Sequence, residues 1–411
     1  MAEIFQTINQ CRICKSNHIS EVMNLGGQPP ANSLYELDKP PEVPLRLMFC
    51  EECSTVQLGE YVDPDYLFSN YLWITGTSDT AINYSKDFSK AALSHINSNL
   101  DDLFIVEIAS NDGTFLKEFK DKGCRVLGID PAANIAEIAS KKGIPTIADF
   151  FSKRLAEKLL IENNYANLIY ARNVIPHVKE IHSVISGIET LLSDEGIGVI
   201  EFHNAGLLLE EMHYDYIYHE HLFYYTLTSI ECLLKMHGLY IFDVSHSPIS
   251  GGSWVVYFSK KVTEKTQAFI EIIDSNSEIQ YNKKDSWLHF SEHAKNHSES
   301  LKNIVTDQVE KHGKIVAYGA SARSSTLLNY SNISSEHISV VIDKNPLKHG
   351  LKTAGSDIPI VSYEAGLSYV EKSKTILLLA WNFKDEIIQE LRSSGYEGNF
   401  IIPLPGQPCI Q

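Results

Sequence analysis

A strand–loop–helix pattern that occurs twice is the feature of this chain that most constrains its fold. Apolar residues 104–108 lead through a short polar loop into a helical pattern at 114–119, and residues 314–318 lead in the same way into Gly319 and a second helical pattern. Strands that alternate with helices predict doubly wound α/β sheets, and a pattern that restarts predicts two of them. Further apolar strands follow at 125–129, 167–171 and 196–202, and again at 338–342, 374–380 and 399–402.

The length of the chain predicts several folding units. Its 411 residues exceed what a single hydrophobic core usually organises. We expect three parts: residues 1–75, a central α/β domain at 76–262, and a C-terminal part at 263–411 that begins with a helical linker. Apolar side chains at helical spacing indicate an ordinary packed helix in that linker: Trp287, Phe290, Ala294, Leu301, Ile304, Val305 and Val309.

Two Cys-x-x-Cys knuckles, Cys11 with Cys14 and Cys50 with Cys53, predict a metal site in the first part. In a reducing compartment, paired knuckles at this separation fit a tetrahedral zinc ion better than disulfides. Because sulfur would occupy all four positions, the zinc would be structural and would hold together a lobe with few regular elements. Redox chemistry at one knuckle is the alternative, and the pairing argues against it.

Composition excludes two classes of partner. The formal net charge is −17, whereas affinity for a nucleic-acid backbone requires many cations. The longest apolar runs, such as 376–381, fall far short of the roughly 20 residues that cross a bilayer. The first residues carry neither the basic nor the apolar part of a secretory signal. We therefore expect a cytoplasmic protein that binds neither nucleic acid nor membrane and acts on a small molecule.

The loop after residues 104–108 indicates the cofactor. Asp130 ends the second strand, where an acid hydrogen-bonds ribose hydroxyls in Rossmann-like sheets. Ala109 and Asn111 stand where glycines would make room for a pyrophosphate, so S-adenosylmethionine fits better than a dinucleotide. A generic crossover with a surface aspartate is the alternative. The other contacts that we expect lie at the amino-acid end or the adenine of the cofactor: Glu107, Gly113, Asp149 and Phe150.

Titratable side chains cluster in the middle of the chain. The segment Tyr218-His219-Glu220-His221 precedes Phe223, Tyr224 and Tyr225. Imidazoles, a carboxylate and phenols are costly to bury unless they are paired, and enzymes accept that cost where protons must move. Together with the cofactor loop, this cassette predicts a cofactor-dependent enzyme with acid–base chemistry.

These motifs resemble those of the S-adenosylmethionine-dependent sugar C-methyltransferases that act on nucleotide-linked 4-ketosugars. The resemblance covers essentially the whole chain and rests on the order of the motifs across three domains. It implies a zinc lobe, a class I methyltransferase domain and a second Rossmann-like domain. The matching segments are the four-cysteine lobe and residues 107–114, 173–177, 218–221, 251–253, 318–330, 342–346, 379–382 and 402–405.

The resemblance also implies roles for individual residues. It assigns to His221 the removal of a proton beside the ketone, and Glu220 would orient the cluster. Tyr218 would donate to the ketone or enolate oxygen, and His177 would be a second acid–base or oxyanion group. We rank His219 below His221, because in an extended segment it would face away from Tyr218 and Glu220.

The resemblance extends to contacts outside the cassette. It adds Asn173 to the cofactor contacts and places Tyr71 where the N-terminal lobe approaches the cofactor and sugar. We interpret His203 and His213 as ordinary polar residues. Trp254 departs from the family pattern, in which a smaller residue and an arginine follow the glycine turn.

The second strand–loop–helix predicts an anion site, because backbone amides gather before a helix. We expect the diphosphate of the substrate there, with the sugar reaching across to His221. NAD(P) binding by a dehydrogenase is the alternative, but no catalytic Tyr-x-x-x-Lys pair is evident. The expected substrate contacts are Tyr318, Gly319, Ser321, Arg323 and Lys344.

The sequence therefore predicts a zinc-stabilised C-methyltransferase that uses S-adenosylmethionine. It would methylate a nucleotide-diphosphate 4-keto-deoxysugar through an enolate, at the carbon adjacent to the ketone; we favour C3, and C5 is the alternative. Three alternatives differ in class: an O- or N-methyltransferase on another small molecule, an NAD(P)-dependent oxidoreductase, and a non-catalytic sugar-nucleotide binding protein.

Overall fold

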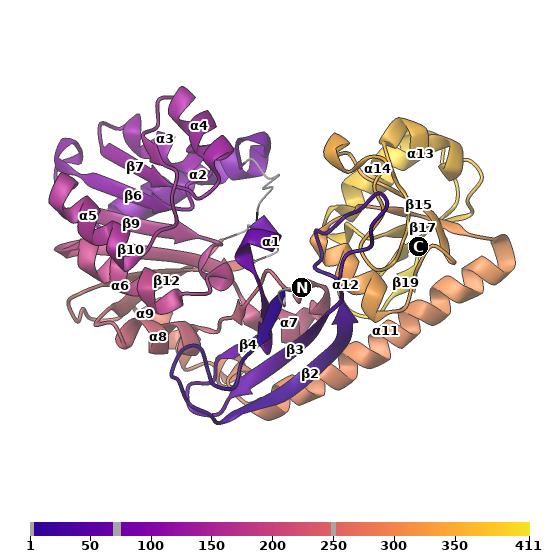
Figure 1. Cartoon of the computed structure of the whole chain (residues 1–411), viewed down its shortest axis with the longest axis horizontal. Helices are drawn as coiled ribbons and strands as arrows, with labels where there is room; N and C mark the ends of the chain where they lie inside the picture. The colour runs from indigo at the N-terminus through magenta and orange to yellow at the C-terminus, as the bar shows by residue number, and fades with distance from the viewer. Residues whose placement is uncertain (1–3, 69–74, 248–251) are drawn as a thin grey trace.

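The computed structural model describes residues 4–68, 75–247 and 252–411, so Tyr71 lies outside the described residues. Four β-sheets organise these ranges. In Figure 1 the central sheet and the C-terminal sheet lie on opposite sides, and the N-terminal lobe and the long helix α11 lie beneath them.

The N-terminal lobe is richer in regular structure than we predicted. An antiparallel sheet has the order β11-β4-β3-β2, and β1 pairs separately with β5. The expectation of few regular elements in this lobe was wrong. In β3, for example, buried and half-buried residues alternate, as they do in a strand with one face in a core. The elements are β1 (Phe5–Thr7), β2 (Ile19–Gln28), β3 (Val43–Cys50), β4 (Val56–Leu58), β5 (Glu60–Val62), α1 (Pro64–Phe68) and, from the middle of the chain, β11 (Phe223–Tyr224).

The central sheet confirms the predicted α/β architecture. Its order is β12-β13-β10-β9-β6-β7-β8; the strands from β10 to β8 are parallel, and β13 runs antiparallel to its neighbours. The strands are β6 (Phe104–Ile108), β7 (Arg125–Ile129), β8 (Thr146–Ile147), β9 (Ala166–Arg172), β10 (Leu192–His203), β12 (Tyr240–Ser247) and β13 (Ser253–Ser259). The helices are η1 (Thr75–Thr77), α2 (Asp79–Ser94), η2 (Leu100–Asp102), α3 (Thr114–Lys120), α4 (Ala133–Lys141), α5 (Lys153–Asn163), η3 (Ile175–His177), α6 (Ile181–Leu191), α7 (Ala205–Glu211), η4 (Tyr214–Tyr216) and α8 (Leu227–Lys235).

The C-terminal part contains the second predicted sheet, in the order β16-β15-β14-β17-β18-β19 with only β19 antiparallel. The expected linker is three helices, α9 (Gln267–Ile273), α10 (Asn276–Tyr281) and α11 (Lys284–His312). The strands are β14 (Ile315–Tyr318), β15 (Ile338–Ile342), β16 (Ile360–Val361), β17 (Thr375–Leu378), β18 (Asn399–Ile402) and β19 (Cys409–Ile410). The helices are α12 (Ala322–Tyr330), η6 (Pro346–Lys348), α13 (Tyr363–Val370), η7 (Trp381–Phe383) and α14 (Lys384–Ser393).

Helix α11 joins the parts of the chain. Its buried residues include Trp287, Phe290, Ala294, Leu301 and Val305, as the helical spacing predicted. It contacts β2 of the N-terminal lobe and β14 of the C-terminal sheet. Among the described helices, none is both long and apolar enough to cross a membrane.

The two α/β sheets hold their first loops in the same way. In the central sheet, the backbone amide of Asn111 donates to Asp130 Oδ2 at 2.8 Å. In the C-terminal sheet, the amide of Ala320 donates to Asp343 Oδ2 at 2.8 Å. Each aspartate follows the second strand of its sheet, so in both sheets a carboxylate after the second strand holds the loop after the first strand by a hydrogen bond.

We predict that Gly319→Ala is strongly destabilising. Gly319 has a φ of 98°, and an added Cβ would lie 2.5 Å from the Ala380 Cβ. Gly395 has a φ of 93° but no atom within 4 Å of the same position, so Gly395→Ala is a control for backbone strain alone. Thermal unfolding should show about 1–2 kcal/mol lost for the control and about 1–3 kcal/mol more for Gly319→Ala. Equal losses would contradict close packing of this loop.

Candidate active site

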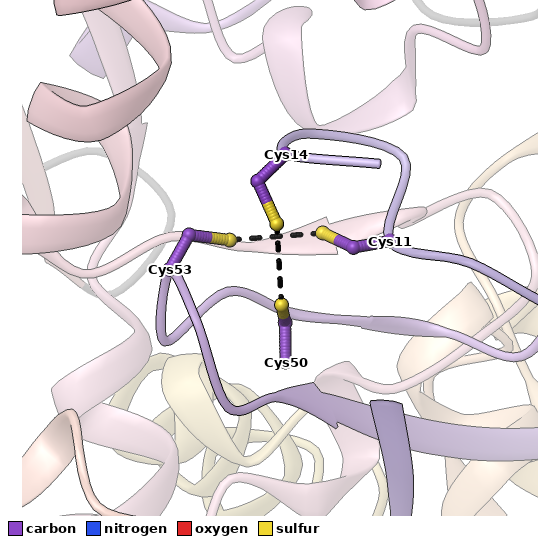
Figure 2. Close-up of side chains that lie close together, drawn as sticks. All are labelled: Cys11, Cys14, Cys50 and Cys53. Carbon is purple, nitrogen blue, oxygen red and sulfur yellow. Dashed lines mark hydrogen bonds between the residues drawn. The ribbon is translucent and has the colours of Figure 1, made fainter. Parts of the chain in front are cut away.

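The four cysteines of the N-terminal lobe converge, as Figure 2 shows. The Cys11 sulfur lies 3.6 Å from that of Cys53, and the Cys14 sulfur lies 3.4 Å from that of Cys50. A tetrahedral ion with Zn–S bonds of about 2.3 Å separates its ligands by about 3.8 Å, so the four sulfurs fit zinc. Gln57 also donates from Nε2 to the Cys11 sulfur at 3.2 Å, as expected of a group that supports a metal-bound thiolate.

The loop between β6 and α3 is sharply bent at the carboxyl edge of the central sheet. Ala109, Asn111 and Gly113 have φ angles of 56°, 50° and 76°, in the left-handed region that glycine adopts freely, asparagine less freely and alanine rarely. Asp130 stabilises this loop by accepting from the amides of Asn111 and Ala132 at 2.8 and 2.9 Å. A carboxylate has further lone pairs, so Asp130 can also accept from a ribose hydroxyl.

Glu107 is a second buried acid at this edge. Its Oε2 accepts from the Tyr170 hydroxyl at 3.0 Å, and burial raises its pKa to about 8. Such a carboxyl ionises more readily when a positive partner arrives. The amino group of the expected cofactor would supply that partner.

The remaining predicted cofactor contacts lie along the same edge. Asp149 and Phe150 follow β8, and both are exposed. Asn173 follows β9, has a φ of 50° and donates from its amide to the Glu201 carbonyl at 2.7 Å. Parallel strands place these loops together although they are distant in the sequence. Their contacts with the cofactor stay predictions.

A cavity of about 20 Å³, large enough for one water molecule, lies at the carboxyl ends of β9 and β10. The structure brings His177 and His221 together here, with ring centroids 4.8 Å apart. The lining comes from segments that the sequence separates: Asn173, Pro176, His177, His203, Ala205, Tyr216, His221, Phe223 and Tyr224.

His177 and His221 are attached in the same way. Nδ1 of His221 lies 2.8 Å from the Tyr216 carbonyl oxygen, and Nδ1 of His177 lies 2.7 Å from the Glu220 carbonyl oxygen. A carbonyl can only accept, so each Nδ1 carries the hydrogen and each Nε2 keeps its lone pair in the neutral ring.

Burial determines the protonation of this pair. It lowers the pKa of His177, and it lowers the pKa of His221 well below 6.5, with further lowering by His177 and Arg323. Both imidazoles are therefore neutral at pH 7, which is the form that accepts a proton.

The cassette forms a turn and not the extended segment that we predicted, because the His221 amide donates to the Tyr218 carbonyl at 2.9 Å. The Tyr218 ring packs against the His221 ring with centroids 4.0 Å apart. Burial raises the pKa of the Tyr218 hydroxyl well above 10, so it remains a hydrogen-bond donor at neutral pH.

The other two cassette side chains reach the N-terminal lobe. Glu220 Oε1 accepts from Asn32 Nδ2 at 2.6 Å, and burial raises the pKa of Glu220 to about 7. Nε2 of His219 lies 3.2 Å from the Val43 carbonyl oxygen. The expectation that His219 faces away from Glu220 in an extended segment was therefore wrong: the segment is a turn, and both side chains contact the N-terminal lobe.

Sequence reasoning missed two residues of the cavity. The ring of Tyr216 lies between those of His203 and His221, with centroids 3.8 and 4.3 Å away. The position of His203 directly after the predicted strand at 196–202 was the available signal, because it puts His203 at the carboxyl edge. Nothing in the sequence indicated the Tyr216 carbonyl as an acceptor.

The predicted diphosphate loop has several side chains already engaged. Ser321 caps α12 by accepting from the Ser324 amide at 3.2 Å. Lys344 pairs with Glu390 at 2.7 Å, and the Tyr318 hydroxyl donates to the same carboxylate at 2.7 Å. Lys344 is well exposed, so an incoming phosphate could displace this pair.

Arg323 points from α12 toward the central domain. Its Nε and Nη2 each lie 3.0 Å from a carboxylate oxygen of Asp215. Trp381 Nε1 donates to the same carboxylate at 2.9 Å. The side chains of Arg323 and Asp215 are 16% and 1% exposed, so this ion pair is a largely buried contact between α12 of the C-terminal part and η4 of the central part.

We predict about one zinc ion per chain by elemental analysis. Cys50→Ser should lose the metal and unfold the N-terminal lobe, because the lobe depends on metal for part of its stability. Cys124→Ser removes a buried cysteine outside the cluster and should keep the zinc. A metal-free protein with a folded lobe would contradict the assignment.

We predict that Asp130→Ala weakens S-adenosylmethionine by roughly 1.5–3 kcal/mol, the range for losing charged hydrogen bonds. Asp343→Ala is the matched control, because it removes the equivalent acid of the other sheet. Calorimetry should show cofactor affinity unchanged in that control. The opposite result would reverse the assignment of the two sheets.

Comparisons with solved structures find matches at low similarity, and several of the matched proteins are named as methyltransferases. The PH0226 protein from Pyrococcus horikoshii OT3 has a TM-score of 0.38 and 14% identity, covering 48% of this chain and 100% of its own. Magnesium protoporphyrin IX methyltransferase from Synechocystis PCC 6803, solved with bound SAM, has a TM-score of 0.34 and 12% identity, covering 47% and 88%.

Three family models match consecutive parts of the chain. They are described as "Putative zinc binding domain" (residues 11–68), "Methyltransferase domain" (88–244) and "C-methyltransferase C-terminal domain" (248–405). C-methyltransferase NovU from Streptomyces niveus is 30% identical over 98% of this chain and 97% of its own length. The order of the domains and this end-to-end similarity show that the chain belongs to the S-adenosylmethionine-dependent C-methyltransferases with an N-terminal zinc-binding domain.

Proposed function

We propose that this enzyme methylates a nucleotide-diphosphate 4-keto-deoxysugar at the carbon beside the ketone, C3 rather than C5. The observation that carries the proposal is the pair of imidazoles at the cavity. Both Nδ1 atoms are committed to backbone carbonyls, and both rings are neutral. The site thus contains bases of the right kind beside the cofactor edge of the sheet.

Carbon methylation requires such a base. A carbon becomes nucleophilic when a proton beside a ketone is removed and the enolate oxygen is stabilised. S-adenosylmethionine supplies the electrophilic methyl group when it is bound. His221 is the better candidate for the base, because its Nδ1 donates to the Tyr216 carbonyl and the Tyr218 ring packs against its ring.

Donors for the enolate oxygen are close to the same ring. The Tyr218 hydroxyl stays protonated at neutral pH because burial raises its pKa. His177 can accept the proton or donate it after it has been protonated. The observed cavity holds about one water molecule, so a sugar ring requires the surrounding groups to open.

We assign the nucleotide to the C-terminal sheet. Gly319 keeps the loop backbone close to Ala380, and α12 begins directly after this loop. Lys344 is exposed, and among the described residues its ion pair is with the partly exposed Glu390. A diphosphate could therefore replace Glu390 as its partner. This assignment places the diphosphate and the sugar on different parts of the chain.

We predict that His221→Asn preserves the fold and both ligand affinities but lowers kcat by about 10²–10⁴, the usual contribution of a general base. It should also abolish solvent deuterium exchange at the carbon beside the ketone, measured by mass spectrometry without cofactor. His219→Asn is the matched control, because His219 is equally buried two residues away but bonds to the N-terminal lobe.

Two results would change the proposal. If His221→Asn exchanges normally while His177→Asn does not, the base is His177 and the C-methylation proposal survives. If the wild-type enzyme exchanges no deuterium into any 4-ketosugar nucleotide, the substrate class is wrong. A mass-spectrometric screen of 4-ketosugar nucleotides for a gain of one methylene would identify the nucleobase and the sugar of the substrate.

A further inference from the structure

The segment that holds His221 is anchored to the C-terminal part of the chain. We call residues 214–217 the anchor segment. The Tyr214 hydroxyl lies 3.0 Å from His297 Nδ1 of α11, and the Ile217 carbonyl accepts from Thr326 Oγ1 of α12 at 2.7 Å. Helix α12 lies against η4, which contains most of this segment.

Asp215 makes the strongest of these contacts. Arg323 approaches its carboxylate with two nitrogens at 3.0 Å each, in the bidentate geometry that adds both strength and direction. Trp381 donates a third hydrogen bond at 2.9 Å. Asp215 is 1% exposed, and a buried carboxylate with three donors from another domain has one stable position.

Tyr216, the residue after Asp215, connects Asp215 to the cavity. Its carbonyl oxygen accepts from His221 Nδ1 at 2.8 Å. Its ring lies between His203 and His221, and the Arg323 guanidinium lies 5.4 Å from the ring centroid. A displacement of Asp215 therefore moves both the acceptor that orients His221 and the ring beside it.

We propose that Asp215 is a positioning residue for His221, held in place by Arg323 and Trp381 of the C-terminal part. The inference rests on the proposed function of His221 as the base. It assigns Arg323 to the sugar end of the site and not to the diphosphate. The C-terminal domain then contributes to proton removal as well as to substrate binding.

The test uses a neutral pair in the full-length enzyme. Asp215→Asn alone leaves a buried, uncompensated arginine and can fail to fold, whereas Asp215→Asn with Arg323→Gln leaves no buried charge. The control is Glu60→Gln with Arg46→Gln, which neutralises another ion pair whose carboxylate is 1% exposed, in the N-terminal lobe. Thermal unfolding should show both variants folded.

Solvent deuterium exchange into the 4-ketosugar nucleotide, without cofactor, is the first measurement. We expect the rate at saturating substrate to fall about 10–100-fold in the Asp215/Arg323 variant, because small displacements of a reacting group cost this much. The substrate concentration for half-maximal rate should change less than about threefold, and the control should exchange like the wild type. An unchanged saturating rate, a loss only in substrate affinity, or an equal loss in the control would overturn the proposal.

Nitrogen NMR of histidine-labelled protein is the second measurement and requires no substrate. The His221 signals can be assigned by their absence in His221→Asn. We expect the wild-type ring to be held in the Nδ1–H form and the neutral-pair variant to populate both tautomers. Retention of the single tautomer would overturn the positioning role. If the wild-type enzyme shows no exchange, the proposed function fails, and this measurement alone decides the inference.

Discussion

The segment between residues 214 and 225 is bound to both the N-terminal lobe and the C-terminal part, and the geometry of the site depends on these contacts. Asp215 is tied to the C-terminal part through Arg323. The side chain of His219 meets the Val43 carbonyl of the N-terminal lobe. Phe223–Tyr224 then adds strand β11 to the sheet of that lobe. His221 lies between these attachments, so its position is determined by all three parts together.

Burial gives this site its chemistry and affects its stability. His177, His203, His213 and His221 all have a lowered pKa, mainly because burial disfavours the charged ring. Their contribution to folding is complete above the unfolded pKa near 6.5 and is lost as the pH falls toward the folded values. Burial raises the pKa of Glu220 to about 7, so its protonated form stabilises the fold below pH 4.5 and this stabilisation is lost as the pH rises toward 7. Between these values, raising the pH therefore favours folding through the histidines and disfavours it through Glu220.

The sequence predicted those elements that carry a local signal. The strands at 104–108 and 125–129 match β6 and β7, because buried parallel strands are short, continuous apolar runs. The sheet of the N-terminal lobe was missed for physical reasons. Register shifts in β2, between Glu21 and Met23 and again between Asn24 and Gly27, break its alternation. Strand β11 is two residues long and has no periodicity of its own.

The sequence alone determined the two α/β sheets, the four-cysteine cluster and the place of Asp130 directly after its strand, since each depends on residues close together in the chain or on unusual spacing. Tertiary structure decided where the side chains point. It turned Arg323 toward Asp215 and His219 toward the N-terminal lobe, and it placed His203 in the cavity. Arg323 and His219 depend on partners more than 100 residues away, and His203 depends on Tyr216, which packs against it from a later loop. A local pattern contains no information about such partners, because they come together only when the sheets pack.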